Sequence, residues 1–322
     1  MEASLTVLTA ILPIFSIIGC GVLARMFGWL DESADKSLMK LIINLLYPAL
    51  IFNLILGNDI LRKPENLIIP PLLGLGSILI GFLIASLFAK WFKIGSKEDR
   101  RTFSFVTGIY NSFYFSLPVV GLFFDREVMG LLLVFNLGVE LAIWLVGVGF
   151  ILVPMQSKSL FKRLINAPVI AVLLASWLNY IRVDQVMPES ALKVIGMLGQ
   201  CAIPLGLILI GATFVELKAT ISTLTKIKIP ILASVLRLAV IPATLLCAAY
   251  FMELSPEMRK VVVVQAAMPC AVFPIVLVRH FGGSADIAFK IVLSTTLLSL
   301  FTIPFWIKKG MELLGLKFSF CF

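Results

Sequence analysis

The chain has 322 residues, a formal net charge of +9 and a mean hydropathy of +1.05, with 60% hydrophobic and only 14% charged residues. Soluble domains carry roughly 25% charged residues, so this composition excludes an ordinary soluble protein and indicates a multi-pass membrane protein. The positive charge does not indicate a nucleic-acid partner, because the basic residues lie in short loops between apolar runs, where they orient a protein in the bilayer.

The first apolar run covers 5–27 and follows Glu2 instead of a basic stretch. It is longer than the core of a cleavable signal peptide, so we interpret it as a retained first helix. Gly19 and Gly21 in this run lack the sequence context of a phosphate-binding loop. They predict close packing of the first helix against another helix.

Further apolar runs of similar size continue along the chain. About 20 apolar residues cross the hydrocarbon core as a helix. The ten runs of this kind cover 5–27, 36–57, 67–92, 100–124, 128–153, 163–181, 190–215, 228–251, 258–281 and 285–309. They predict an all-α integral membrane protein with ten transmembrane helices, and the loops between them are too short for a second domain.

The distribution of Lys and Arg predicts how the helices are oriented. The loops after the odd-numbered segments, with the adjacent helix ends, carry sixteen of the 27 basic residues. The opposite side carries ten, and Arg237 lies inside segment 8. Because basic loops stay in the cytoplasm, we expect both termini on the non-cytoplasmic side of a cell (inner or plasma) membrane.

Corresponding residues of the two halves share an offset of 156 positions. The pairs are Pro48 and Pro204, Pro118 and Pro274, and Asn44 and Gln200. Because each half has an odd number of spans, the second half enters the membrane upside down. We therefore predict a 5+5 inverted repeat, a common plan of secondary transporters, with halves 1–156 and 157–322.

Segments 4 and 9 carry prolines where a helix is most costly to interrupt. The polar residues and prolines concerned are Asn111, Ser112, Ser116, Pro118, Gln265, Met268, Pro269 and Pro274. A broken helix frees N–H groups that attract anions and carbonyls that attract cations. Interrupted helices in corresponding places mark a transporter's binding site. We predict substrate binding at these residues, with breaks near 116–118 and 268–274; a proline kink without a ligand is the alternative.

Three polar residues are expected deep in other segments. Glu140 lies about twelve residues into segment 5, and Asn136 one turn earlier on the same face. We interpret them as a site for a coupling proton or sodium ion, with a structural hydrogen bond as the alternative. Arg237 predicts a contact with a carboxylate substrate, or an ion pair with Glu140.

Catalytic and cofactor motifs are not found in the sequence. The single histidine and the scattered cysteines lack metal-ligand spacing, so we expect no metal site. Without a nucleotide-binding motif, we expect no cofactor and no direct use of ATP. An intramembrane enzyme is the alternative from another class, and a channel would need a continuous polar lining.

The motif "QAAMPCAVFPIVLVRHF", followed by "GGSADIAFKIVLSTTLLSLFTIP", resembles the last two helices of the auxin efflux carrier family. Segment 4 is similar as well, with Asn111 and Pro118 at the family's crossover asparagine and proline. The resemblance extends over essentially the whole chain. This chain lacks the long cytoplasmic loop of the plant carriers, and its segment 4 is bulky ("YNSFYFSLP") where bacterial members often have glycines.

The resemblance implies a scaffold of segments 1, 2, 6 and 7, a mobile unit of segments 3–5 and 8–10, and helices 4 and 9 that cross at the midplane. It also implies an organic anion as cargo and a homodimer. A sodium-coupled, bile-acid-like symporter is similar in architecture and stays an alternative. The substrate, the coupling ion and the direction of transport are left open.

Overall fold

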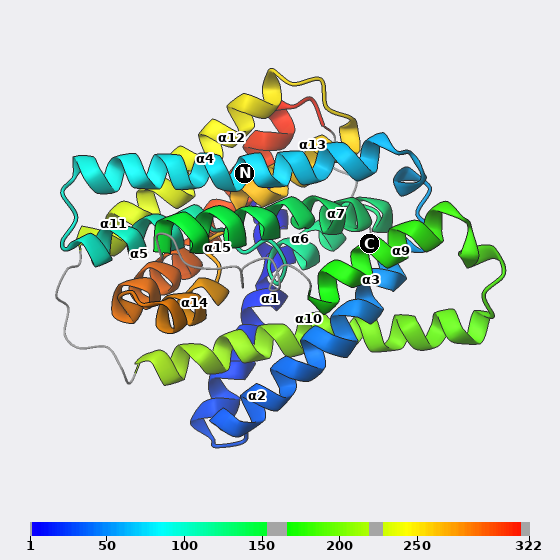
Figure 1. The fold of residues 1–322 in the computed structure, drawn as a ribbon, viewed down its shortest axis with the longest axis horizontal. Coiled ribbons are helices and arrows are strands. Elements are labelled where there is room, and N and C mark those ends of the chain that lie inside the picture. Colours follow the sequence, from blue (N-terminus) through cyan, green and yellow to red (C-terminus); the bar gives the residue numbers. More distant parts are fainter. Residues whose placement is uncertain (1, 153–165, 219–227, 317–322) are drawn as a thin grey trace.

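The computed structural model describes residues 2–152, 166–218 and 228–316 of the chain. Apart from one isolated β-bridge, the regular structure in these ranges is helical (Figure 1). The main helices are α1 (Glu2–Met26), α2 (Glu32–Leu41), α3 (Tyr47–Ile55), α4 (Glu65–Trp91), α5 (Lys97–Gly108), α6 (Ser116–Phe123), α7 (Arg126–Ala142), α9 (Ala167–Tyr180), α10 (Glu189–Lys218), α11 (Lys228–Val235), α12 (Ile241–Tyr250), α13 (Pro256–Ala267), α14 (Phe273–Phe281) and α15 (Ala285–Leu313).

Wider π-helical turns join or extend several of these helices, and short 3₁₀ turns lie in two loops. The π turns are Ile42–Leu46 between α2 and α3, Ile143–Leu152 after α7, and Leu236–Val240 between α11 and α12; the 3₁₀ turns are Ile60–Arg62 and Val183–Gln185. Because π turns keep the chain helical, α2–α3 and α11–α12 each form one long helix. Such turns are often found at functional sites.

Seven helices in the described ranges are long and apolar enough to cross a membrane. The other three predicted segments are not long continuous helices. Segment 6 contains the shorter apolar helix α9, whereas segments 4 and 9 are each divided into two short helices, α5 with α6 and α13 with α14. The boundary predicted between the halves, at 156 and 157, lies outside the described residues.

The helices pack in two groups. In the first group, α1 packs against α10, and α3 packs against both α10 and α9. In the second group, α4 packs against α7 and α5, while α15 packs against α11 and α13. The groups meet where α1 contacts α15 and α6, and where α7 contacts α3 and α9. The first group, with α2, lies mainly in the lower half of Figure 1 and the second in the upper half.

Glycine allows the backbones of α1 and α10 to come into direct contact. A Cβ atom at Gly21 would lie 2.1 Å from the carbonyl oxygen of Ile208, and one at Gly211 would lie 2.0 Å from that of Ile18. The packing role predicted for Gly21 is confirmed, whereas a Cβ at Gly19 would meet nothing within 4 Å. Small residues at helix contacts are typical of membrane bundles, because they allow close backbone approach.

This contact gives a stability prediction with a matched control. We expect Gly211→Ala to lower the free energy of unfolding by roughly 1–3 kcal/mol, because the new methyl group must push α10 away from α1. Gly19→Ala adds the same methyl group to open space and is expected to leave it nearly unchanged. Thermal unfolding of both variants in detergent measures the difference, and equal melting temperatures would contradict this packing.

Candidate functional site

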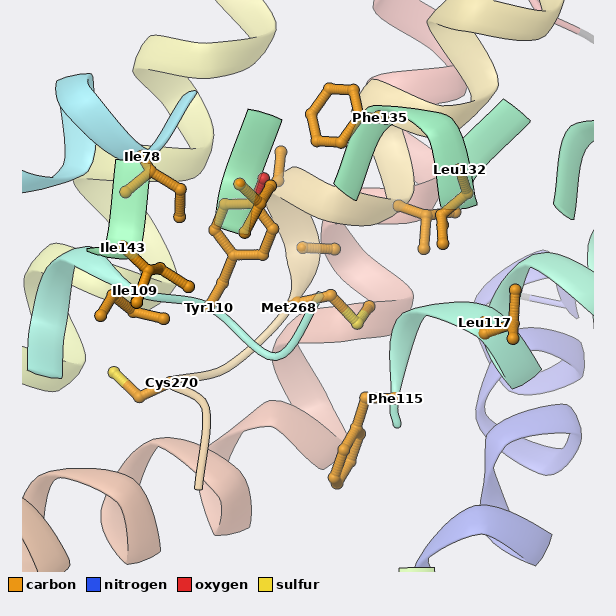
Figure 2. Close-up of a cluster of buried hydrophobic side chains, with 14 of the residues drawn as sticks. Ile78, Ile109, Tyr110, Phe115, Leu117, Leu132, Phe135, Ile143, Met268 and Cys270 are labelled. Atoms are coloured by element: carbon orange, nitrogen blue, oxygen red, sulfur yellow. The ribbon is translucent and has the colours of Figure 1, made fainter. Parts of the chain in front are cut away.

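The breaks in segments 4 and 9 lie against each other. The chain is non-helical between α5 and α6, at 109–115, and between α13 and α14, at 268–272. The amide of Asn111 donates to the Pro269 carbonyl at 2.8 Å, and the amide of Ala271 donates to the Ile109 carbonyl at 3.0 Å. These bonds make an antiparallel bridge between Tyr110 and Cys270, and Figure 2 shows the two stretches side by side. Each break therefore satisfies backbone groups that the other has freed.

The break in segment 4 lies earlier than predicted. Ser116 and Pro118 were expected in the break, but they belong to the first turn of α6. Pro274 likewise lies in the first turn of α14, whereas Met268 and Pro269 lie in the break as expected. The reason is that proline fits the first turn of a helix, where its missing N–H would have no helical partner. These prolines start the second half-helix instead of occupying the gap.

Three of the predicted residues form one hydrogen-bonded polar cluster beside the bridge, and Asn111 adjoins it along the chain. The side-chain amide of Gln265 donates to the Asn136 side-chain oxygen at 2.9 Å, and Asn136 donates to the Ser112 carbonyl at 2.7 Å. Asn111 accepts a hydrogen bond from the Phe115 amide at 3.3 Å through its side-chain oxygen. Asn111 and Gln265 are buried. Asn136, predicted with the coupling ion, therefore lies at the breaks themselves.

Three polar groups at the paired breaks and the start of α6 keep hydrogen-bonding capacity. The Oε1 atom of Gln265 is buried without a hydrogen-bond partner, and so is the hydroxyl of Ser116. The Nδ2 atom of Asn111 has no hydrogen-bond partner among the described residues. Because an unpaired polar group costs free energy inside an apolar bundle, these atoms are suited to receive a polar ligand.

Arg237 binds backbone carbonyls at the end of α13, next to the bridge. It lies in the π turn Leu236–Val240 and is 0% exposed. Its Nε donates to the Met268 carbonyl and its Nη2 to the Ala266 carbonyl, both at 3.0 Å. The Tyr110 ring lies 5.0 Å from its Cζ atom. The guanidinium therefore caps carbonyls that the break in segment 9 leaves without helical partners.

The charge of Arg237 is not neutralised within the described part of the chain. No carboxylate there forms an ion pair with it, and its Nη1 atom is buried without a hydrogen-bond partner. The interpretation of an ion pair with Glu140 is wrong, since Arg237 binds two backbone carbonyls instead. An isolated buried cation is costly and attracts an anion.

Glu140 lies one turn beyond Asn136 on α7 and points to another partner. Its Oε2 accepts a hydrogen bond from the indole nitrogen of Trp144 at 3.1 Å. Trp144 in turn packs edge-on against Phe273, at the start of α14. Glu140 therefore contacts the second half-helix of segment 9 through Trp144 and is not part of the polar cluster.

Three aromatic residues of the break in segment 4 cover the site and were not predicted as functional. The ring centroids of Phe113 and Tyr47 are 4.1 Å apart, and those of Phe115 and Phe15 are 5.5 Å apart. A Cβ atom at Gly206 would lie 2.0 Å from the Tyr114 ring. These rings fill the space between the break and α1, α3 and α10. The bulky residues of "YNSFYFSLP" were the available signal, because aromatic side chains in a polar break need an apolar surface to cover.

Tyr110 and Thr295 are two further residues that sequence reasoning missed. The Tyr110 hydroxyl is 2.7 Å from that of Ser77 on α4, and Thr295 on α15 accepts a hydrogen bond from the Cys270 amide at 3.3 Å. They connect the paired breaks to α4 and α15. Within the described residues, no group of three or more His, Cys, Asp or Glu is placed to hold a metal ion.

Interrupted helices that meet inside an apolar helical bundle define a class: membrane transport proteins with discontinuous helices. The chain belongs to the auxin efflux carrier family, since the family described as membrane transport protein matches it at residues 6–161 and 150–307. The family predicted from the sequence is therefore confirmed.

Two relatives align with the chain over nearly their whole length, and both are described as uncharacterized transporters. The chain is 23% identical over 304 residues to an uncharacterized transporter of Methanothermobacter thermautotrophicus. It is 25% identical over 307 residues to an uncharacterized transporter of Methanocaldococcus jannaschii. Each alignment covers 92% of this chain and 96% of the relative. The protein is a multi-pass membrane transporter.

Proposed function

We propose that the protein is a secondary transporter that moves a small organic anion, a carboxylate, by alternating access, and that it is not an enzyme. The anion binds where the breaks in segments 4 and 9 meet. The observation that carries this proposal is Arg237, a fully buried cation without a carboxylate partner in the described residues, next to Tyr110 and Met268. The free donor of Asn111 adds a neutral hydrogen bond for the same ligand.

The proposed architecture has ten spans in a 5+5 inverted repeat. Seven long helices, the shorter α9 and the two divided segments together supply ten. Two backbone hydrogen bonds support a crossing of segments 4 and 9. One joins Asn111 to Pro269, and the other joins Ala271 to Ile109. The β-bridge thus connects matching places in the two proposed halves, 1–156 and 157–322.

The two packing groups support a scaffold and a mobile unit. The first group contains segments 1, 2, 6 and 7, and the second contains segments 3–5 and 8–10. The aromatic side chains of Phe113, Tyr114 and Phe115 extend from the second group toward the first. We propose that movement of the second group carries the site past this aromatic contact, which closes the site in the present conformation.

The coupling ion is proposed to act through Glu140 and Asn136. If a proton is carried by Glu140, we expect Glu140→Gln to remove the pH dependence of transport while anion affinity stays within about twofold, because Glu140 lies outside the polar cluster. Uptake into proteoliposomes over a range of external pH measures this. A pH profile equal to that of the wild type would leave Glu140 with the structural role of orienting Trp144.

A first experiment tests the substrate class. Purified protein should be heated with a panel of small mono- and dicarboxylates and with matched amides and amines. We expect one or more carboxylates to raise the melting temperature and the uncharged or cationic analogues to have no effect. Stabilisation by cations alone would contradict the proposal. Uptake that requires sodium would favour a sodium-coupled symporter over proton coupling.

We also propose that the protein works as a homodimer in the cell membrane, with both termini outside. Native mass spectrometry of the detergent-solubilised protein tests the dimer, and labelling of a cysteine added after Phe322 in intact cells tests the orientation. A monomer, or a C-terminus that is accessible only after lysis, would contradict these two points.

A further inference from the structure

A basic hollow lies at one end of the second packing group, away from the paired breaks. It is an open cavity of about 600 Å³ formed by the last turns of α4, the start of α5 and the π turn after α7. Its lining includes Lys90, Lys93, Lys97, Arg100, Arg101 and Phe150. We call these residues the basic basin.

The cations of the basin are not balanced by carboxylates. Among the described residues, no acidic side chain forms an ion pair with any of the five. Arg100 donates to the carbonyls of Ile94 and Gly95 at 3.3 and 3.0 Å, which fixes its guanidinium at the edge of the basin. Asp99 nearby is used in the capping box with Ser96. Glu98 lines only an adjoining hollow, together with Lys97 and Arg101.

The wall of the basin below these cations is apolar. Phe150 is 72% exposed, and it lines the cavity together with Ile151 and Ala89. Trp91 and Phe92 at the end of α4 are also exposed. Exposed aromatic residues at the end of a membrane helix mark the level of the lipid headgroups. The basin therefore presents cations at headgroup level and an apolar surface toward the hydrocarbon core.

We propose that the basic basin binds the phosphate headgroup of an anionic phospholipid. A lipid matches both the charged and the apolar lining of the cavity. Its phosphate pairs with the lysines and arginines, while its acyl chains lie along Phe150. Free phosphate would use only the cations. The loop between segments 3 and 4 is the most basic loop of the chain and is predicted to be cytoplasmic, the side on which anionic lipids concentrate. This inference does not depend on the proposed substrate or coupling.

The test uses the full chain and two double variants with the same change of charge. The basin variant is Lys93→Gln with Arg101→Gln, which leaves Arg100 and its carbonyl contacts intact. The control variant is Lys63→Gln with Lys193→Gln, at positions predicted on the opposite side. Melting temperatures are measured in detergent with added phosphatidylglycerol, phosphatidylcholine or inorganic phosphate, and lipid adducts are counted by native mass spectrometry.

We expect phosphatidylglycerol to stabilise the wild type and the control variant more than the other two additives do. We expect the basin variant to bind it roughly thirtyfold more weakly, from the loss of two cations near the headgroup. The proposal is overturned if phosphatidylglycerol has no advantage over phosphatidylcholine. It is also overturned if both variants lose the advantage equally, or if inorganic phosphate reproduces the effect and the basin variant abolishes it. Melting temperatures in phosphatidylcholine show whether both variants are folded.

Discussion

Arg237→Met is expected to weaken anion binding by at least about thirtyfold while the melting temperature of the ligand-free protein changes by only a few degrees. Removing one partner of a buried charge pair costs about 2–5 kcal/mol, and 1.4 kcal/mol corresponds to a factor of ten. In the absence of the anion, the stabilising contacts that the substitution removes and the cost of the buried charge that it also removes are of similar size. Methionine loses two charged hydrogen bonds of roughly 1.5–3 kcal/mol each and a cation–π contact with Tyr110 of about 2. It also removes a buried charge that costs several kcal/mol.

Arg237→Lys separates the two roles of this side chain. Lysine keeps the positive charge, but its compact ammonium cannot reproduce the planar contacts of arginine with the Ala266 and Met268 carbonyls. If the charge binds the anion, lysine retains more affinity than methionine. A purely structural arginine predicts the opposite pattern, in which the folded methionine variant binds the anion as tightly as the wild type and only its melting temperature falls. Isothermal calorimetry with the carboxylate found in the screen, together with thermal unfolding, measures both quantities.

Asn111→Ala and Gln265→Ala are expected to weaken anion binding by about ten- to a hundredfold each. A hydrogen bond to a charged ligand contributes roughly 1.5–3 kcal/mol, and the unpartnered Nδ2 of Asn111 can donate one. The unpartnered atom of Gln265 is the acceptor Oε1, so Gln265 can donate to an anion only through the Nε2 that bonds Asn136. Gln265 also holds Asn136 at 2.9 Å, so its variant disturbs a second residue of the cluster. Asn111→Ala removes the acceptor for the Phe115 amide as well as the free Nδ2 donor.

Asn44→Ala is the matched control for these two variants. Asn44 lies in the π turn of segment 2 and donates to the Lys40 carbonyl of its own helix at 2.8 Å. Removing this side-chain amide should leave the anion affinity unchanged. Wild-type affinity in both Asn111→Ala and Gln265→Ala would place the substrate elsewhere in the molecule.

The presence of both breaks and the start of the break in segment 9 could be predicted from the sequence, but the position of the break in segment 4 could not be. Prolines in an apolar run indicate an interruption, and their offset pointed to segments 4 and 9. Pro118 and Pro274 nevertheless lie in the first turns of α6 and α14. Only the pairing of Asn111 with Pro269 defines the gap, and such pairing between distant segments leaves no local signal in the sequence.

Residue type and depth in a segment predict which residues of the polar cluster matter, but not which residues they contact. Buried amides in segments 4, 5 and 9 were recognised, because a polar residue inside a membrane segment is costly and usually has a role. Their contacts depend on tertiary packing, which brings Gln265 to Asn136 across 129 residues of sequence. For the same reason the alternative of an ion pair between Arg237 and Glu140 was wrong. An acidic residue was the obvious candidate, but broken helices offer free carbonyls that compete for a buried cation.

The most direct test of the account is uptake of the best-binding carboxylate into proteoliposomes, compared between the wild type, Arg237→Met and Asn44→Ala. We expect saturable uptake by the wild type and by Asn44→Ala, and uptake at the level of protein-free liposomes for Arg237→Met, although that variant is folded. Equal uptake by Arg237→Met and the wild type would contradict the claim that this buried charge at the paired breaks binds the transported anion.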